Sequence, residues 1–187
     1  MRRGFKTEAE KASAAARQAL KLRPLAPLDP WAYAQFLEVL VLDFASLHMS
    51  PSAIHQLTVA DGDSWSAMTL KEGKTLAIVL NPAHAQTRRR SDLMHELAHI
   101  ELRHTPVRVD VSKTGVLLLS DYSEDQEQEA DWYGAALLLP RSALVHHRSR
   151  GRTAADIAAL YGVSASLCEW RLRMTGVDIQ VRRAHVR

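Results

Sequence analysis

His95-Glu96-Leu97-Ala98-His99 places two imidazole rings one helical turn apart, with a carboxylate directly after the first ring. Residues four apart share a face of an α-helix, so both rings can reach one metal ion. Apolar residues recur at helical spacing around the pentapeptide, and no proline or glycine interrupts 88–103. This pattern predicts a half-buried helix. On that helix the histidines suit zinc, and Glu96 is placed to accept a proton from a metal-activated water molecule.

A catalytic zinc site usually has three protein ligands, so a third must come from another segment. The acidic stretch 121–131 leads into an apolar run closed by a proline, which predicts a second amphipathic helix. Glu127 and Asp131 lie one turn apart on it, so Glu127 can bind the metal while Asp131 accepts a ring N–H from a ligand histidine. Glu124 shares this face and is the alternative third ligand. Glu129 points away, and we expect it to be solvated.

Zinc-activated hydrolysis of a carbonyl compound also needs a group that stabilises negative charge on the carbonyl oxygen. His104 follows His99 by five residues, so on a continuous helix it faces away from the ligand side. The remaining candidates for this role are His146, His147 and Tyr133.

The two predicted metal motifs together resemble the ImmA/IrrE family of metallo-endopeptidases. The resemblance rests on Arg90-Ser91-Asp92-Leu93-Met94-His95-Glu96-Leu97-Ala98-His99 and on Glu127-Gln128-Glu129-Ala130-Asp131-Trp132-Tyr133-Gly134-Ala135-Ala136-Leu137-Leu138-Leu139-Pro140. In that family the first glutamate of the second motif is the third ligand, which implies Glu127. Ala98 stands where the family often has glycine, and alanine is the better helix former.

The resemblance extends over about residues 5–175 and implies a gluzincin-like zinc peptidase. It implies limited cleavage of a specific protein, a helix–turn–helix transcriptional repressor that is often encoded nearby. Such cleavage would relieve repression of mobile-element or stress genes.

The bulk properties are those of a globular protein. The chain has 187 residues, 47% of them hydrophobic and 24% charged, with a net charge of +3, which suits a single domain over 1–187. Cys168 is the one cysteine, so an internal disulfide is excluded and a cytoplasmic setting is expected. No apolar run has the length of a signal-peptide core or a membrane span, so we expect neither export nor anchoring.

The expected fold is α+β. Strand patterns at 39–44, 64–70 and 76–80 predict a small, mostly antiparallel sheet of about three strands. We expect this sheet to pack on a zincin-like helical core, so that 5–140 forms the catalytic part. The strand at 76–80 is a candidate edge to which an extended substrate could add, and a paired internal position is the alternative.

The C-terminal subregion 141–187 is basic and helical in pattern, with nine arginines against three acidic residues. Within it, 153–173 resembles a helix–turn–helix motif, with Gly162 at the turn and Ser164 capping the second helix. The second helix also has an apolar face suited to packing. This favours a structural or substrate-docking role over DNA binding.

Two rival functions remain open from the sequence. The chain could be a zinc-containing regulator that binds a repressor without cutting it. Alternatively, 153–173 could bind DNA while the metal is structural. A structural zinc normally has four protein ligands, and only three are evident, which favours catalysis.

Overall fold

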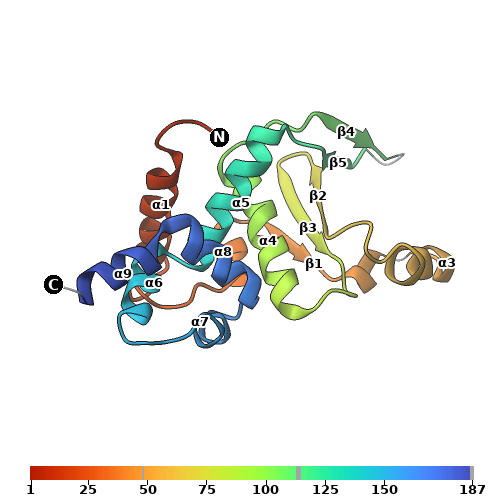
Figure 1. The fold of residues 1–187 in the computed structure, drawn as a ribbon. Coiled ribbons are helices and arrows are strands. Elements are labelled where there is room, and N and C mark those ends of the chain that lie inside the picture. The colour runs from red at the N-terminus through yellow and green to blue at the C-terminus, as the bar shows by residue number, and fades with distance from the viewer. Residues whose placement is uncertain (48, 113–114, 186–187) are drawn as a thin grey trace.

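The computed structural model describes residues 1–47, 49–112 and 115–185, and these residues form an α+β fold (Figure 1). The described elements are α1 (Phe5–Ala19), α2 (Pro30–Phe36), β1 (Leu40–Leu42), η1 (Phe44–Leu47), α3 (Pro51–His55), η2 (Gln56–Ala60), β2 (Ala67–Glu72), β3 (Thr75–Leu80), α4 (Gln86–Glu101), β4 (Arg108–Val111), β5 (Leu117–Ser120), α5 (Glu124–Leu138), α6 (Arg141–Arg148), α7 (Ala154–Tyr161), α8 (Ala165–Thr175) and α9 (Val177–His185).

The sheet of the described residues has five strands in the order β1-β3-β2-β5-β4. Strand β1 pairs with β3 in parallel, and the other three pairings are antiparallel. The prediction of about three strands was therefore too low. It missed β4 and β5, which have only four residues each. The valines of β4 are exposed, so this strand buries no face of the sheet.

Strand β3 is an internal strand, so of the two alternatives for 76–80 the candidate edge is wrong and the paired internal position is correct. Its partners are β1 on one side and β2 on the other. Its last four residues, from Ala77 to Leu80, are all buried, which is the pattern of a strand covered on both faces. Among the described strands, the edges of the sheet are β1 and β4.

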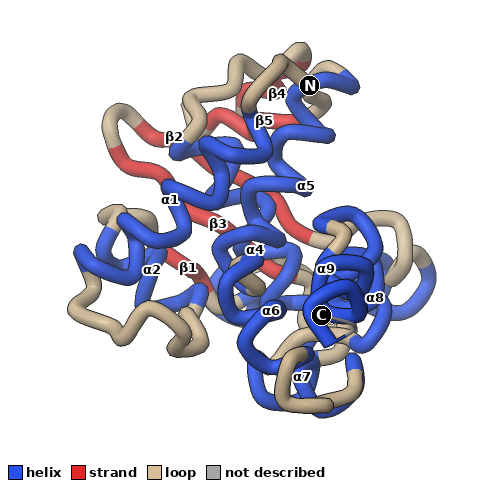
Figure 2. The backbone as a smooth tube through the Cα atoms, turned by 60° about the vertical axis from the view of Figure 1, so that its left-hand side comes forward, coloured by secondary structure: helices blue, strands red, loops and turns tan. Residues whose placement is uncertain are grey.

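Helix α4 packs on β2 and β3 with one face and on α5 with another, and α1 covers the far side of α5 (Figures 1 and 2). The apolar face of α4 is fully buried at Leu93, Met94, Leu97 and Ala98. The two predicted metal-binding segments are thus neighbouring helices in the middle of the molecule.

The backbones of α4 and α5 come very close at Gly134. A Cβ atom at this position would lie 3.2 Å from the carbonyl oxygen of Met94 and 3.4 Å from the backbone nitrogen of His95. The first distance is shorter than ordinary van der Waals contact, so a side chain here would require the facing backbone to shift by a few tenths of an ångström.

Three buried side chains hold the carbonyl groups at the C-terminal end of α5. Ser13 Oγ donates to the oxygen of Ala136 at 2.7 Å, and Arg17 Nη2 donates to that of Leu137 at 2.8 Å. Arg171 donates to Leu139 O through Nε at 3.1 Å and Nη2 at 2.9 Å. The last turn of a helix has no internal partners for these oxygens, so α1 and α8 together fix the end of α5.

The C-terminal helices α6 to α9 lie at one end of the molecule, away from the sheet (Figure 2). Helices α7 and α8 occupy the segment where the helix–turn–helix pattern was predicted, and they are joined through Gly162 at φ +64°. Their packing does not test DNA binding, which stays a prediction. None of the described helices combines the length and apolar character that crossing a membrane requires.

Candidate metal centre

The side chains of His95, His99 and Glu127 meet between α4 and α5. Nε2 of His95 lies 2.9 Å from Nε2 of His99 and 3.1 Å from Oε2 of Glu127. The third separation, from His99 Nε2 to Glu127 Oε2, is 3.7 Å. One donor atom from each residue is thus within 4.8 Å of the other two.

This donor set fits a zinc ion. Zinc binds histidine nitrogen and carboxylate oxygen at about 2.0–2.2 Å with tetrahedral geometry, so two ligand atoms on one ion are about 3.4 Å apart. The three observed separations lie on either side of this value. The group offers three side chains that could bind a metal, which is the number of protein ligands typical of a catalytic rather than a structural zinc.

Asp131 lies on the outer side of His95. Its Oδ1 is 3.0 Å from Nδ1 of the ring, while Nε2 of the same ring faces Glu127. Burial alone lowers the pKa of His95, but the hydrogen bonds to Asp131 and Glu127 raise it to about 10. These two carboxylates therefore favour a positive charge at this point, whether it is a proton or a metal ion.

The alternative ligand Glu124 is not part of this group. It is exposed in the first turn of α5 and accepts a hydrogen bond from Gln128 at 3.3 Å. The helix begins at Glu124 because Ser123 and Gln126 form a capping box. That start places Glu127 one turn into the helix, opposite the histidines.

Glu96 is half-buried and is held from the sheet. Thr69 Oγ1, on the fully buried side chain of a β2 residue, donates to Glu96 Oε2 at 2.5 Å. Burial raises the pKa of Glu96, and the bond from Thr69 acts in the opposite direction. Sequence reasoning did not identify Thr69, because this contact joins residues 27 positions apart.

Tyr122 is a second neighbour of the centre that sequence reasoning missed. Its ring stacks on His99 with a centroid separation of 3.7 Å, and its backbone N–H donates to the carboxylate of Glu127. Burial, together with the charges of Glu96 and Glu127, raises the pKa of Tyr122 to about 12. Tyr122 therefore contacts predicted ligands from both helices.

His104 contacts His99, so the prediction that it faces away was wrong. Helix α4 ends at Glu101, and Arg103 adopts φ +54°, which reverses the chain. The backbone N–H of His104 then donates to the oxygen of His99 at 3.0 Å. Helical geometry no longer applies beyond this turn, and Nδ1 of His104 lies 3.0 Å from Nδ1 of His99.

The prediction that Glu129 is solvated was also wrong. Its side chain is only 14% exposed, and its Oε2 lies 3.7 Å from Nε2 of His104. The backbone N–H of Arg2 donates to Oε1 of the same carboxylate at 3.0 Å.

The three candidates for carbonyl-oxygen stabilisation make their contacts elsewhere. His146 and His147 on α6 contact each other, and His147 Nε2 lies 3.3 Å from the hydroxyl of Tyr161. The Tyr133 hydroxyl is hydrogen-bonded to Glu101, and its ring packs on Phe5. Tyr122 and His104 are instead the aromatic side chains that contact the predicted ligand His99.

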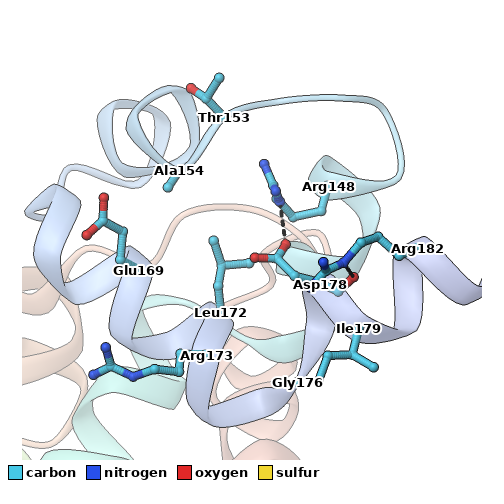
Figure 3. Close-up of a pocket in the computed structure, with 10 residues that line it drawn as sticks. All are labelled: Arg148, Thr153, Ala154, Glu169, Leu172, Arg173, Gly176, Asp178, Ile179 and Arg182. Carbon is cyan, nitrogen blue, oxygen red and sulfur yellow. Dashed lines mark hydrogen bonds and ion pairs between the residues drawn. The ribbon is translucent and has the colours of Figure 1, made fainter.

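A separate cavity of about 440 Å³ lies between α7, α8 and α9 and contains none of the predicted metal ligands. Figure 3 shows Arg148 reaching Asp178 across this cavity, with Nε to Oδ1 at 2.7 Å. Glu169 and Arg173 add one charge of each sign on the α8 side. The wall is therefore of mixed charge.

The lone thiol belongs to the core and not to either site. Cys168 on α8 is fully buried, and burial raises its pKa to about 11. A buried thiol with a raised pKa is typical of a structural rather than a nucleophilic cysteine.

Comparison with known proteins identifies the family. The model of peptidase family M78, described as the IrrE N-terminal-like domain, matches residues 53–173. This match includes the whole of α4 and α5, with the three grouped side chains and Glu96. A search of curated proteins found no match. The chain belongs to peptidase family M78, the ImmA/IrrE family of zinc-dependent peptidases.

Proposed function

We propose that this protein is a zinc endopeptidase that cleaves one specific protein, with His95, His99 and Glu127 as ligands and Glu96 as the general base. The observation that carries the proposal is the meeting of three donor atoms beside a half-buried carboxylate that does not join them. A carboxylate next to the ligands, but not among them, is what a hydrolytic site needs for proton transfer.

A bound zinc ion would polarise the scissile carbonyl group and lower the pKa of a water molecule, so that the water could lose a proton and attack the carbonyl carbon. Glu96 accepts the proton of that water and returns it to the departing amine. The bond from Thr69 keeps one carboxylate oxygen fixed and leaves the other free for the proton. Asp131 orients His95 through Nδ1, so that Nε2 is directed at the metal position.

We assign the docking of an extended substrate segment to β4, the sheet edge on the side of the site. Val107, directly before β4, donates its N–H to Asp121 O, and Tyr122 follows Asp121 along the chain. The start of β4 is therefore close to Tyr122, whose ring stacks on His99. Val107, Val109 and Val111 are all exposed there, and an extended peptide could cover them while it pairs with the strand.

The substrate we propose is a helix–turn–helix transcriptional repressor in the cytoplasm, whose cleavage would relieve repression of mobile-element or stress genes. Family membership supports this assignment. The subregion 141–187, with its excess of arginine, is a candidate surface for recognising that partner.

The substitution Glu96→Gln tests the proposal. It keeps the size of the side chain and removes the base, so zinc content should persist while cleavage of a co-expressed neighbouring repressor stops. Glu124→Gln is the matched control, because Glu124 is an exposed glutamate outside the donor group. A Glu96→Gln protein that still cleaves at the wild-type rate would show that Glu96 is not the base.

The same proteins separate the alternative functions. A non-cleaving regulator would bind the repressor equally well with and without Glu96 and would cut neither repressor nor casein. A DNA-binding protein with a structural metal would shift labelled DNA in an Arg173-dependent manner. Either result in the absence of any cleavage would refute the peptidase assignment.

A further inference from the structure

The two predicted histidine ligands differ in what lies behind them. His95 has the carboxylate of Asp131 at 3.0 Å from Nδ1. His99 is more deeply buried, and behind its Nδ1 lies another imidazole, that of His104, also at 3.0 Å. The His104 ring meets the His99 ring edge-on, with an interplanar angle of 74°.

This contact determines where the protons lie when His99 binds a metal through Nε2. The metal-bound ring is neutral and carries its hydrogen on Nδ1, so His99 is the donor in the contact with His104. Nδ1 of His104 must then be the acceptor. A neutral imidazole that accepts at Nδ1 carries its own hydrogen on Nε2.

Nε2 of His104 is directed at Glu129. The distance from this nitrogen to Oε2 of Glu129 is 3.7 Å, which is longer than a hydrogen bond, and within the described part of the chain the nitrogen has no hydrogen-bond partner, so Glu129 is the acceptor nearest to it. The side chain of His104 is 6% exposed and that of Glu129 is 14% exposed, so water competes little for this contact. The N–H of Arg2 holds the other carboxylate oxygen.

We infer that His104 and Glu129 are positioning residues for the metal, and that they act through His99 as a two-step relay. Glu129 favours the hydrogen on Nε2 of His104, which makes Nδ1 of His104 an acceptor and directs the lone pair of His99 Nε2 at the metal. Each histidine ligand thus has a carboxylate behind it, directly for His95 and through a second ring for His99. The inference rests on the metal site of the proposed function.

The relay predicts a loss of zinc affinity when the acceptor is removed. His104→Phe keeps an aromatic ring but has no acceptor, and we expect its zinc affinity to fall about 10- to 100-fold, as for other outer partners of metal ligands. His104→Asn can place an oxygen near the position of Nδ1, so it should recover at least half of the loss on a logarithmic scale. Glu129→Gln should lose affinity several-fold.

The experiment is a competition of the purified protein with a chelator for Zn²⁺, and the absorption spectrum of the Co²⁺-loaded protein serves as a second readout. His147→Phe is the matched control, because His147 is a buried histidine that contacts Tyr161 and not the donor group. Circular dichroism confirms that each variant is folded. Wild-type zinc affinity in folded His104→Phe, or equal losses in the Phe and Asn variants, would overturn the inference.

These measurements contain no substrate, so they are independent of the peptidase assignment. A protein with His104-dependent zinc affinity that cleaves nothing would refute the proposed function and leave the relay standing. An active peptidase whose zinc affinity does not depend on His104 would refute the relay alone.

Discussion

Replacing Thr69 with valine removes one hydroxyl group and almost no volume, and it isolates the contribution of the sheet to Glu96. The Thr69 Oγ1 to Glu96 Oε2 contact is 2.5 Å long and lies on a fully buried threonine. A hydrogen bond to a charged group is worth about 1.5–3 kcal/mol. Since about 1.4 kcal/mol corresponds to a factor of ten, kcat/KM at neutral pH should fall about 10- to 100-fold.

The pH profile gives the sign of this effect. The bond from Thr69 favours the charged carboxylate and so opposes the rise in the pKa of Glu96 caused by burial. Its removal raises that pKa further, so Glu96 stays protonated to a higher pH and cannot act as a base there. The acidic limb of kcat/KM should therefore move upward by about one to two pH units, and activity should recover in alkaline solution.

The assay is cleavage of the wild-type substrate, or of casein, between pH 5 and 10 by zinc-loaded protein. Thr69→Ser keeps the donor and should behave like the wild type, and Thr75→Val controls for an exposed threonine of the same sheet. Equal losses in the valine and serine variants, or an acidic limb that does not move in Thr69→Val, would refute the reasoning.

Three further predictions concern the metal, the fold and the thiol. Zinc uptake at pH 8 should release about one proton, because the pKa of His95 is about 10 without metal and zinc binds the neutral ring. Titration calorimetry in buffers of different ionisation enthalpy measures this release, and identical heats of zinc binding in all buffers would contradict it. The substitution Arg171→Met should lower the free energy of unfolding by about 3 kcal/mol or more, because it leaves Glu10 and the Leu139 oxygen without their buried partner. In a thermal melt the Tm should then fall by at least about 6 °C. The control Arg173→Met replaces an exposed arginine on the same helix and should melt near the wild-type temperature. Cys168, with its pKa raised to about 11 by burial, should react with iodoacetamide at pH 8 much more slowly than a free thiol until urea unfolds the chain; rapid labelling of the folded protein would count against a closed core.

Most of what the sequence could predict came from the regular spacing of apolar and metal-binding residues along the chain. The α+β class and the family are confirmed. The four residues His95, His99, Glu127 and Asp131 lie together because spacings of four on two helices place each pair on one face. Their roles as ligands and as an outer partner stay predictions.

The residues that sequence reasoning missed depend on turns and on contacts between distant segments. His104 was misplaced because Arg103 adopts a left-handed conformation that an arginine does not signal. Thr69 reaches Glu96 from another element, and Glu129 is covered by Arg2 from the start of the chain. No local pattern contains such information.

The missed hairpin of β4 and β5 is a different case, because its signal was present. Valines alternate with charged residues over 107–111, Gly115 follows, and 116–119 is apolar. Each strand is only four residues long, which is the lower limit of the length over which alternation indicates a strand.

The close approach at Gly134 has a consequence for the metal selectivity that we expect of the centre. Gly134 follows Glu127 by seven residues, so it lies on the stripe of α5 that faces α4. A side chain there would require a shift of a few tenths of an ångström at this contact, and a shift of α5 would move the predicted third ligand with it. That displacement is comparable to the difference between zinc–ligand distances and those of a larger ion such as calcium. We therefore expect a residue with no donor atom to influence which ion the predicted centre prefers.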